Sequence, residues 1–226
     1  KLLPSPAAIW GMVEVMALTP DKRTGDYLLW ADTTASLFRL WAGLGIATAF
    51  ALVVGLLNGV VPMVRAALAP FVAVLSMVPP LALLPILFIA LGLGEVSKIA
   101  LIVIGVAPIL TRDLALSAIA LPAEQIVKAQ TLGASTWQVA LRIALPQAMP
   151  RLLDNLRLSL CPAWVYLITA EAIAADVGLG YRIFLVRRYL AMDVILPYVL
   201  WISLLAVIMD VALKMLAAEG AAAAGG

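Results

Sequence analysis

The sequence predicts an all-α, polytopic membrane protein with five transmembrane helices. Hydrophobic residues make up 65% of the 226 residues and charged residues only 12%, whereas a soluble domain carries about 25% charged residues. So few charges are too few to cover a folded surface in water. In addition, five stretches contain the roughly 20 apolar residues that a helix needs to cross a hydrocarbon core of about 30 Å.

The expected spans cover residues 34–59, 66–93, 97–118, 151–175 and 193–216. Together they form one transmembrane domain, residues 34–216, preceded by an external or interfacial segment, residues 1–33. The low-complexity tail, residues 217–226, is expected to be a linker or a disordered end. The distribution of Lys and Arg favours an external N-terminus and a cytoplasmic location for the long connection at about residues 119–148.

Small residues and prolines mark the first two spans. Gly55 and Gly59 form a G-x-x-x-G pair, a spacing that lets helix backbones approach closely in lipid, although glycine is also simply common in membrane helices. Pro79, Pro80 and Pro85 remove backbone donors and break the second span. Lipid-facing backbone does not tolerate such a break, so Met77, Pro79 and Pro80 are expected near a translocation pathway, with a structural kink as the alternative.

The first half of the long connection has the signals of a short helix. Pro122 suits the first helical position. Glu124 and Lys128 stand four residues apart, in the order that favours an ion pair on a helix. Gly133 is expected directly after the helix, where a left-handed backbone conformation is needed.

The second half predicts another short helix. Ser135 and Gln138 have the spacing of a capping box. Pro146 is expected to end this helix and Pro150 to open the next span. Two short amphipathic helices outside the membrane favour docking into a groove of a soluble partner, with a solvated helical loop as the alternative.

Several function classes are excluded by composition. The chain contains no histidine and a single cysteine, Cys161, so histidine-based catalysis, imidazole metal sites and internal disulfides are absent. The net charge of +2 without a basic patch argues against nucleic acid binding. No phosphate loop of the type G-x-x-x-x-G-K-[ST] is present, so ATP hydrolysis would need another chain.

The long connection resembles a sequence motif of a known family. Gly133, Ile143, Leu145 and Pro146 match the G-x9-I-x-L-P part of the EAA loop, the coupling helix of ABC importer permeases. The leading E-A-A falls on residues 127–129, where only the second alanine is kept, and Glu124 stands one helical turn earlier. The residues that the resemblance implies for ATPase coupling are Glu124, Lys128, Ala129, Gly133, Ala134, Ser135, Ile143, Leu145 and Pro146.

Shorter segments resemble one branch of these permeases. "PSP", "PPLALLP", "GLGEVSK", "TLGAS" and "GLGY" occur in the order seen in nitrate, sulfonate, taurine and bicarbonate permeases. The resemblance implies a type I importer permease in the bacterial cytoplasmic (inner) membrane, paired with a second copy as a homodimer. It also implies two cytoplasmic ATPase subunits that bind ATP and Mg, an external or periplasmic binding protein, and a further helix before the PSP segment. The chain itself is expected to be no enzyme and to hold no cofactor or metal.

The expected function is to form the translocation pathway for a small polar solute. Intramembrane ionisable residues are candidates because their burial is costly, which singles out Glu171 and Asp176. Glu171 either lines the pathway or forms a structural pair, for which Arg182 is a candidate. Asp176 hints at a cationic or neutral nitrogen compound instead of an anion. The alternative function is a stand-alone secondary transporter or channel.

Overall fold

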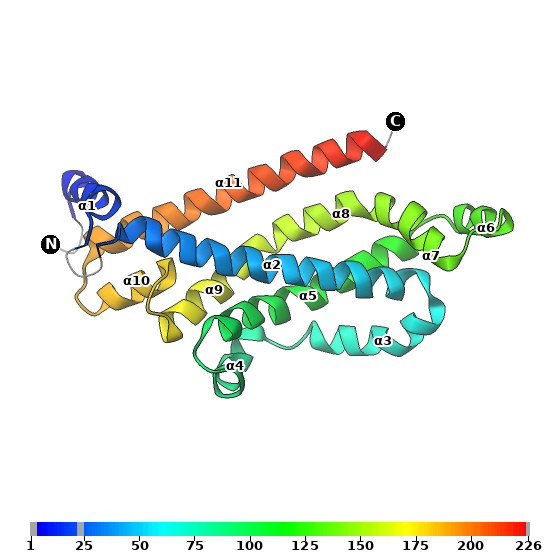
Figure 1. The fold of residues 1–226 in the computed structure, drawn as a ribbon, viewed down its shortest axis with the longest axis horizontal. Coiled ribbons are helices and arrows are strands. Elements are labelled where there is room, and N and C mark those ends of the chain that lie inside the picture. Colours follow the sequence, from blue (N-terminus) through cyan, green and yellow to red (C-terminus); the bar gives the residue numbers. More distant parts are fainter. Residues whose placement is uncertain (1–3, 22–24, 225–226) are drawn as a thin grey trace. The chain divides into compact units, whose positions relative to one another are not determined.

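The structure is a computed structural model that describes residues 4–21 and 25–224, with side chains up to residue 217. All regular elements in this part of the chain are helical, which confirms the all-α class (Figure 1). The chain divides into two compact units, which are described one at a time. Unit 1 comprises Lys1–Gly43, Leu81–Ile102 and Ala163–Ile208, and unit 2 comprises Leu44–Pro80, Val103–Pro162 and Met209–Gly226.

Within the described part of the chain, three helices are long and apolar enough to cross a membrane: α2 (Leu28–Val60), α5 (Glu95–Ile119) and the first 26 residues of α11 (Met192–Ala224). Two further helix pairs qualify if each broken pair is counted as one span: Pro62–Leu75 with Pro80–Leu91, and Thr136–Leu158 with Leu160–Ala174. The total of up to five spans agrees with the number that the sequence predicts.

The first span begins earlier than expected, whereas the last candidate span ends at Ala217, one residue after the expected end of the transmembrane domain. Helix α2 begins at Leu28 and not at residue 34, because partners inside unit 1 neutralise Asp32 and Arg39 in its first turns. Helix α11 continues to Ala224, so the expectation of a linker or disordered tail is wrong for the described residues. Alanine has the highest intrinsic helix propensity, and four of the last residues of α11 are alanines.

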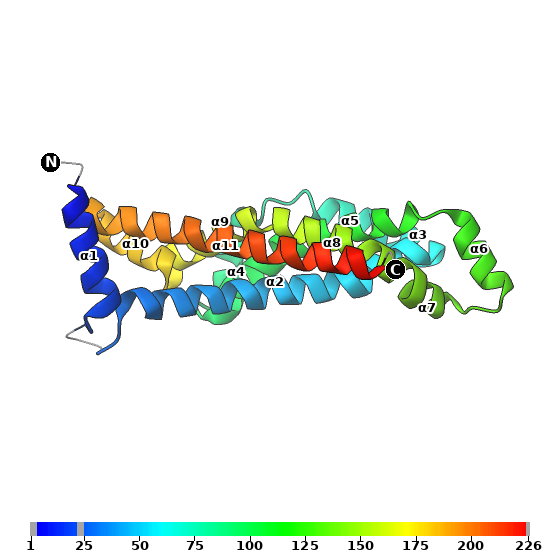
Figure 2. The same ribbon diagram turned by 90° about the horizontal axis from the view of Figure 1, so that it is seen from above.

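Unit 1 begins with the short helix α1 (Pro6–Leu18). Ser5 caps it and Pro6 occupies its first turn. The helix crosses the beginning of α2 and of α11 at a steep angle (Figure 2). Trp30 of α2 donates from Nε1 to the carbonyl of Ala17 at 3.1 Å, and its ring meets the Trp201 ring edge to face. The aromatic residues therefore hold the N-terminal segment against unit 1.

The rest of unit 1 surrounds the connection between α9 (Leu160–Ala174) and α10 (Leu179–Arg187). The short helix α4 (Leu84–Leu91) belongs to the same unit. Leu84, Leu101 and Ala170 are buried together, with Phe88 and Tyr166 packed against them. Helices α4, α5 and α9 therefore share one apolar core beside that connection.

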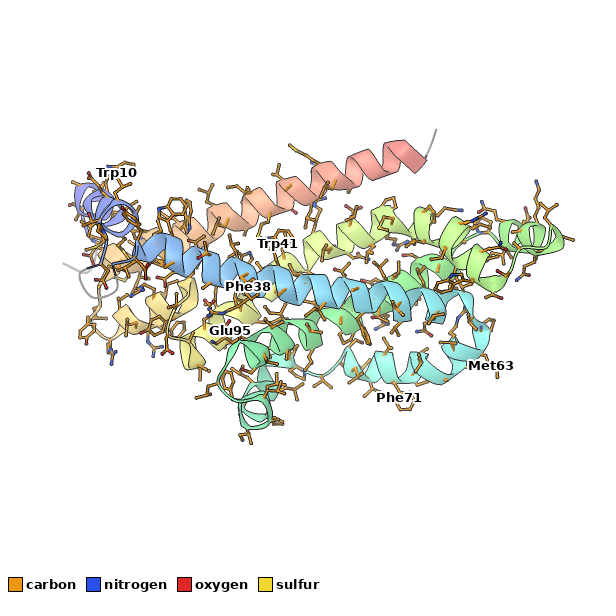
Figure 3. The ribbon with its side chains drawn as sticks, in the orientation of Figure 1. Trp10, Phe38, Trp41, Met63, Phe71 and Glu95 are labelled. Atoms are coloured by element: carbon orange, nitrogen blue, oxygen red, sulfur yellow. The ribbon has the colours of Figure 1, made fainter. Side chains whose placement is uncertain are left out.

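Unit 2 contains the close approach that the G-x-x-x-G pair predicts. A Cβ atom on Gly59 would lie 2.5 Å from the Cβ of Ala118, and one on Gly55 would lie 3.0 Å from the carbonyl oxygen of Thr111. Only glycine leaves room for the backbone of α5 at this distance. Helix α3 (Pro62–Leu75) belongs to the same unit and carries Met63 and Phe71 as exposed side chains (Figure 3).

The predicted proline break is present. Helix α3 ends at Leu75, a 3-10 turn covers Pro80–Leu83, and α4 follows with Pro85 in its first turn. Met77 lies in the gap with 74% of its surface exposed. Prolines interrupt the helix here because they supply no backbone N–H for the helical hydrogen bonds.

Candidate functional site

The predicted coupling segment, residues 123–144, is a pair of short helices at one end of unit 2 (Figures 1 and 2). The first is α6 (Ala123–Thr131), with Pro122 as its N-cap, one residue before the expected position. Gly133 follows with φ of +89°, and its N–H donates to the carbonyl of Gln130 while Ala134 N–H donates to Ala129. These two bonds are the Schellman arrangement, which confirms Gly133 as the bend.

The ion pair expected on α6 is absent. Glu124 and Lys128 are both exposed, and no ion pair joins them among the described residues. Holding two long, solvated side chains in one geometry costs about as much entropy as their attraction contributes. Both charged side chains of α6 are therefore exposed and outside any ion pair with a described residue.

The second helix of the segment begins as predicted and ends differently. Ser135 accepts from Gln138 N–H and Gln138 Oε1 accepts from Ser135 N–H, which confirms the capping box at α7 (Thr136–Val139). The expectation that Pro146 ends this helix and Pro150 opens the next is wrong. A π-helical turn, Ala140–Ala144, joins α7 directly to α8 (Leu145–Leu158), and both prolines lie inside α8.

The π turn explains how the helix continues through Pro146. Leu145 N–H reaches back five residues to the carbonyl of Ala140. A proline in an α-helix clashes with the carbonyl four residues earlier and leaves it without a donor. The wider turn shifts the hydrogen-bond pattern just before Pro146, so the ring is accommodated without a break. The coupling segment is thus continuous with α8.

A hollow of about 360 Å³ lies beside the bend. It brings together four of the predicted coupling residues: Ala129, Gly133, Ala134 and Ile143. Leu132, Gln138 and Arg142 also line it, and sequence reasoning did not select them.

The remaining predicted coupling residues do not line this hollow. Ser135 caps α7, Leu145 is half-buried and Pro146 is exposed. Leu132, directly after α6, is 82% exposed, and Trp137 of α7 is 61% exposed, so large apolar side chains are exposed on both sides of the bend. Exposed apolar groups beside a hollow are typical of a surface that binds another protein.

Polar contacts fix the segment to the rest of unit 2. Gln147 of α8 donates to Gln125 of α6 at 3.0 Å. Farther along α8, Arg157 donates from Nε and from a terminal nitrogen to the two oxygens of Asp210 on α11, each at 3.0 Å. Polar side-chain contacts therefore link α6 to α8, and α8 to α11.

A second polar centre lies in unit 1 and is embedded among apolar helices. It consists of three carboxylates and three cations, which we call the charge cluster: Asp32, Arg39, Glu95, Lys98, Glu171 and Arg182. Asp32, Ser36 and Arg39 lie on one face of α2, at spacings of four and three residues, and all are buried. Sequence reasoning missed all three, although their helical spacing is the signal that would have found them.

Glu171 is fully buried, and its partner is Arg39. Arg39 donates to Glu171 Oε1 at 2.6 Å, Ser36 donates to the same oxygen at 2.7 Å, and Gly180 N–H donates to Oε2 at 2.9 Å. The pairing with Arg182 considered from the sequence is wrong, because Arg182 binds Asp32 instead. Both carboxylate oxygens of Glu171 therefore have hydrogen-bond partners inside unit 1.

Arg39 connects the buried carboxylate to the edge of unit 1. Its Nε donates to Glu95 at 2.5 Å, and Lys98, itself buried, donates to the same carboxylate at 3.0 Å. Glu95 is half exposed and begins α5 (Figure 3). A negative charge in the first turn of a helix also offsets the positive end of the helix dipole.

Gly178 lets the α9–α10 connection enter the charge cluster. A Cβ atom on Gly178 would lie 2.6 Å from the Glu171 carboxylate, and the residue has φ of +144°. Its N–H donates to Asp32 at 2.9 Å, and the next N–H, of Leu179, donates to Ser36 at 2.9 Å. The "GLGY" motif therefore places backbone donors directly on buried oxygens.

Asp32 binds Arg182, the remaining cation of the charge cluster, and Tyr198. It accepts from Arg182 Nε at 2.8 Å and from the Tyr198 hydroxyl at 2.8 Å. Burial lowers the pKa of Arg182, but the hydrogen bond and the attraction to Asp32 outweigh burial and raise it above its ordinary value. Arg182 thus stays a cation.

The remaining pathway candidates lie outside the charge cluster. Asp176 is exposed in the α9–α10 connection, while Met77, Pro79 and Pro80 belong to the proline break. Among the residues that the structure describes, no group of three or more Asp, Glu, Cys or His side chains is placed to hold a metal ion.

Comparison with known proteins decides the family. Residues 42–219 match the family described as "Binding-protein-dependent transport system inner membrane component". The chain belongs to this family. It is therefore a multi-pass inner-membrane permease of an ABC importer, works with a binding protein, and leaves ATP hydrolysis to partner subunits. The alternative of a stand-alone secondary transporter or channel falls with this finding.

Individual relatives agree with the assignment. The permease is 36% identical to the taurine transport system permease protein TauC of Escherichia coli over 95% of this chain and 77% of that protein. It is 31% identical to the bicarbonate transport system permease protein CmpB of Synechocystis over 80% and 66%. A chain of the MetNI methionine ABC transporter, in an inward-facing conformation, matches its fold with a TM-score of 0.74 at 20% identity, over 88% of this chain and 99% of that chain.

Proposed function

We propose that this permease imports a small sulfonate-type solute and that residues 123–144 couple its movement to ATP hydrolysis. The importer then contains two copies of the permease and two ATPase subunits, which bind ATP and Mg. The taurine permease supports the solute class, because it is 36% identical over 95% of this chain. One structural observation carries the coupling role: a rigidly capped, apolar-tipped helix pair that continues into α8 without a break.

Mechanically, the segment acts as a lever. An ATPase groove that holds the exposed Leu132 and Trp137 moves when the ATPase pair closes on ATP. The capping box and the Schellman turn leave little slack in the segment, so the displacement passes to α8. The Arg157–Asp210 pair then carries it to α11. Alternating access requires that ATP bind one of two conformations better than the other.

Gly133 permits a clean test of the coupling role. A Cβ atom there meets no other atom of the permease within 4 Å, so within the permease a substitution acts mainly through the left-handed backbone conformation. Gly133→Val is expected to abolish co-purification with the ATPase and the solute-stimulated ATP hydrolysis. Gly133→Asn, which tolerates this conformation, is the matched control and is expected to retain both. A valine variant with full coupled ATPase activity would refute the lever.

Asp176 favours a second candidate solute, a cationic nitrogen compound such as an amidine. Its carboxylate is exposed in unit 1 and would attract a cation and repel a sulfonate. The test is uptake of radiolabelled taurine and of a small amidinium compound by the reconstituted importer with its binding protein. Under the sulfonate proposal, Asp176→Lys keeps taurine uptake. If the native importer takes up the amidinium compound and no taurine, and Asp176→Lys loses the amidinium uptake, the solute is a cation.

A further inference from the structure

A pocket in unit 2 combines two arginines with apolar walls, and neither the lever nor the charge cluster uses it. Its volume is about 200 Å³, and it lies between the end of α2, one side of α3 from Arg65 to Ala73, and the last turns of α5. Arg65 and Val72 lie on one face of α3, and Arg112, Leu116 and Ile119 lie on one face of α5, at helical spacings of four and three.

Neither arginine forms an ion pair with a carboxylate among the residues that the structure describes. Arg65 donates only to backbone carbonyls, from Nε to Asn58 at 3.1 Å and from a terminal nitrogen to Gly59. Arg112 is exposed and forms no ion pair with any described residue. Asp113, the next residue on α5, attracts Arg112 but forms no ion pair with it and does not line the pocket. Charged groups in membrane helices are costly unless they are paired, so two such arginines call for a counter-anion.

A buried side chain in the same pocket has unused hydrogen-bonding capacity. Asn58 is 3% exposed, and its Oδ1 has no partner among the described residues. Buried polar groups are nearly always hydrogen-bonded. Asn58 thus adds an amide, which both donates and accepts, to the two cations.

The position of the pocket favours one source for the anion. The last turns of α5 line it, and α5 leads within a few residues into the coupling segment. Given the cytoplasmic location proposed for that segment, the pocket faces the inner leaflet, where acidic phospholipids gather. Six of its nine lining residues are Ala, Val, Leu or Ile, which suits an acyl chain better than a free, fully hydrated anion.

We propose that this pocket binds an acidic phospholipid, with the phosphate between Arg65, Arg112 and Asn58 and an acyl chain along Val72 and Leu116. A phosphate offers several oxygens to guanidinium groups, which bind it with charge-assisted hydrogen bonds. A hydroxyl of a phosphatidylglycerol headgroup supplies the donor that Asn58 Oδ1 lacks. The bound lipid ties the α2–α3 turn to α5.

The test is lipid retention by the intact importer complex, purified in detergent from membranes that contain phosphatidylglycerol and phosphatidylethanolamine. Native mass spectrometry is expected to show phosphatidylglycerol retained on the permease. Arg112→Gln is expected to reduce this retention about tenfold or more. Leu116→Trp, which fills the pocket while keeping both arginines, is expected to reduce it as well. Arg151→Gln is the matched control, because Arg151 is an exposed arginine of the same unit that does not line the pocket.

The outcomes separate the possible ligands. Added inorganic phosphate and taurine are expected to leave the retained phosphatidylglycerol in place, and displacement by either would identify a free-anion site and overturn the proposal. Equal retention in native protein and in Arg112→Gln, or an equal loss in Arg151→Gln, would also overturn it. The readout requires no ATP hydrolysis, so a failure of the lever proposal leaves this result interpretable.

Discussion

Removal of the Glu171 carboxylate tests whether the charge cluster is structural. In Glu171→Ala, Arg39 keeps Glu95 but loses its fully buried partner at 2.6 Å. Ser36 and the Gly180 N–H each lose the acceptor that they now share. Breaking one partner out of a buried ion pair destabilises a protein by about 3–5 kcal/mol, because the other charge stays buried. We expect a loss of stability in that range.

The assay is an SDS-unfolding titration of the purified importer complex in mixed micelles, with taurine uptake measured in parallel. Asp176→Asn is the matched control, since it removes a carboxylate five residues away that is exposed and outside the cluster. Glu171→Ala is expected to lower both stability and uptake, whereas Asp176→Asn lowers neither. A Glu171→Ala protein of native stability that fails in uptake would refute the structural role and return Glu171 to the pathway.

Three further substitutions test the packing and the lever. Gly59→Leu is expected to destabilise the permease by about 1–3 kcal/mol through overpacking against α5. Gly45→Leu is the control, because a Cβ atom at Gly45 meets nothing within 4 Å, and it is expected to leave the SDS-unfolding midpoint unchanged. Equal midpoints for the two variants would contradict the close approach. Ser135→Ala removes the cap of α7 and is expected to cost about 1 kcal/mol and to reduce solute-stimulated ATP hydrolysis; unchanged stimulation would show that the cap is dispensable for coupling. Arg157→Asp places a carboxylate next to Asp210 and is expected to reduce the yield of folded complex. Adding Asp210→Arg restores opposite charges and is expected to recover the yield. A double variant with no higher yield than Arg157→Asp would show that the Arg157–Asp210 pair does not join α8 to α11.

The coupling segment shows how far local signals reach. Gly133 and the Ser135 capping box were predictable because a left-handed turn and a cap are decided by residues within one turn of each other. The fate of Pro146 was not, since its ring normally ends a helix. Here a π turn of five residues accommodates the Pro146 ring, so the helix continues. Contacts between residues distant in the sequence, such as the hydrogen bond between Gln125 and Gln147, 22 residues apart, stabilise this arrangement.

The sequence by itself determined the class, the family and the number of spans of this permease. These follow from length, composition and motifs, because a bilayer demands long apolar helices and the EAA-type loop has a fixed spacing. Only the tertiary structure decided that Glu171 pairs with Arg39 and that Asp32 takes Arg182. Those partners stand more than 130 residues apart along the chain. No local pattern chooses between two arginines, since the choice depends on which helix faces the α9–α10 connection once the apolar surfaces have packed.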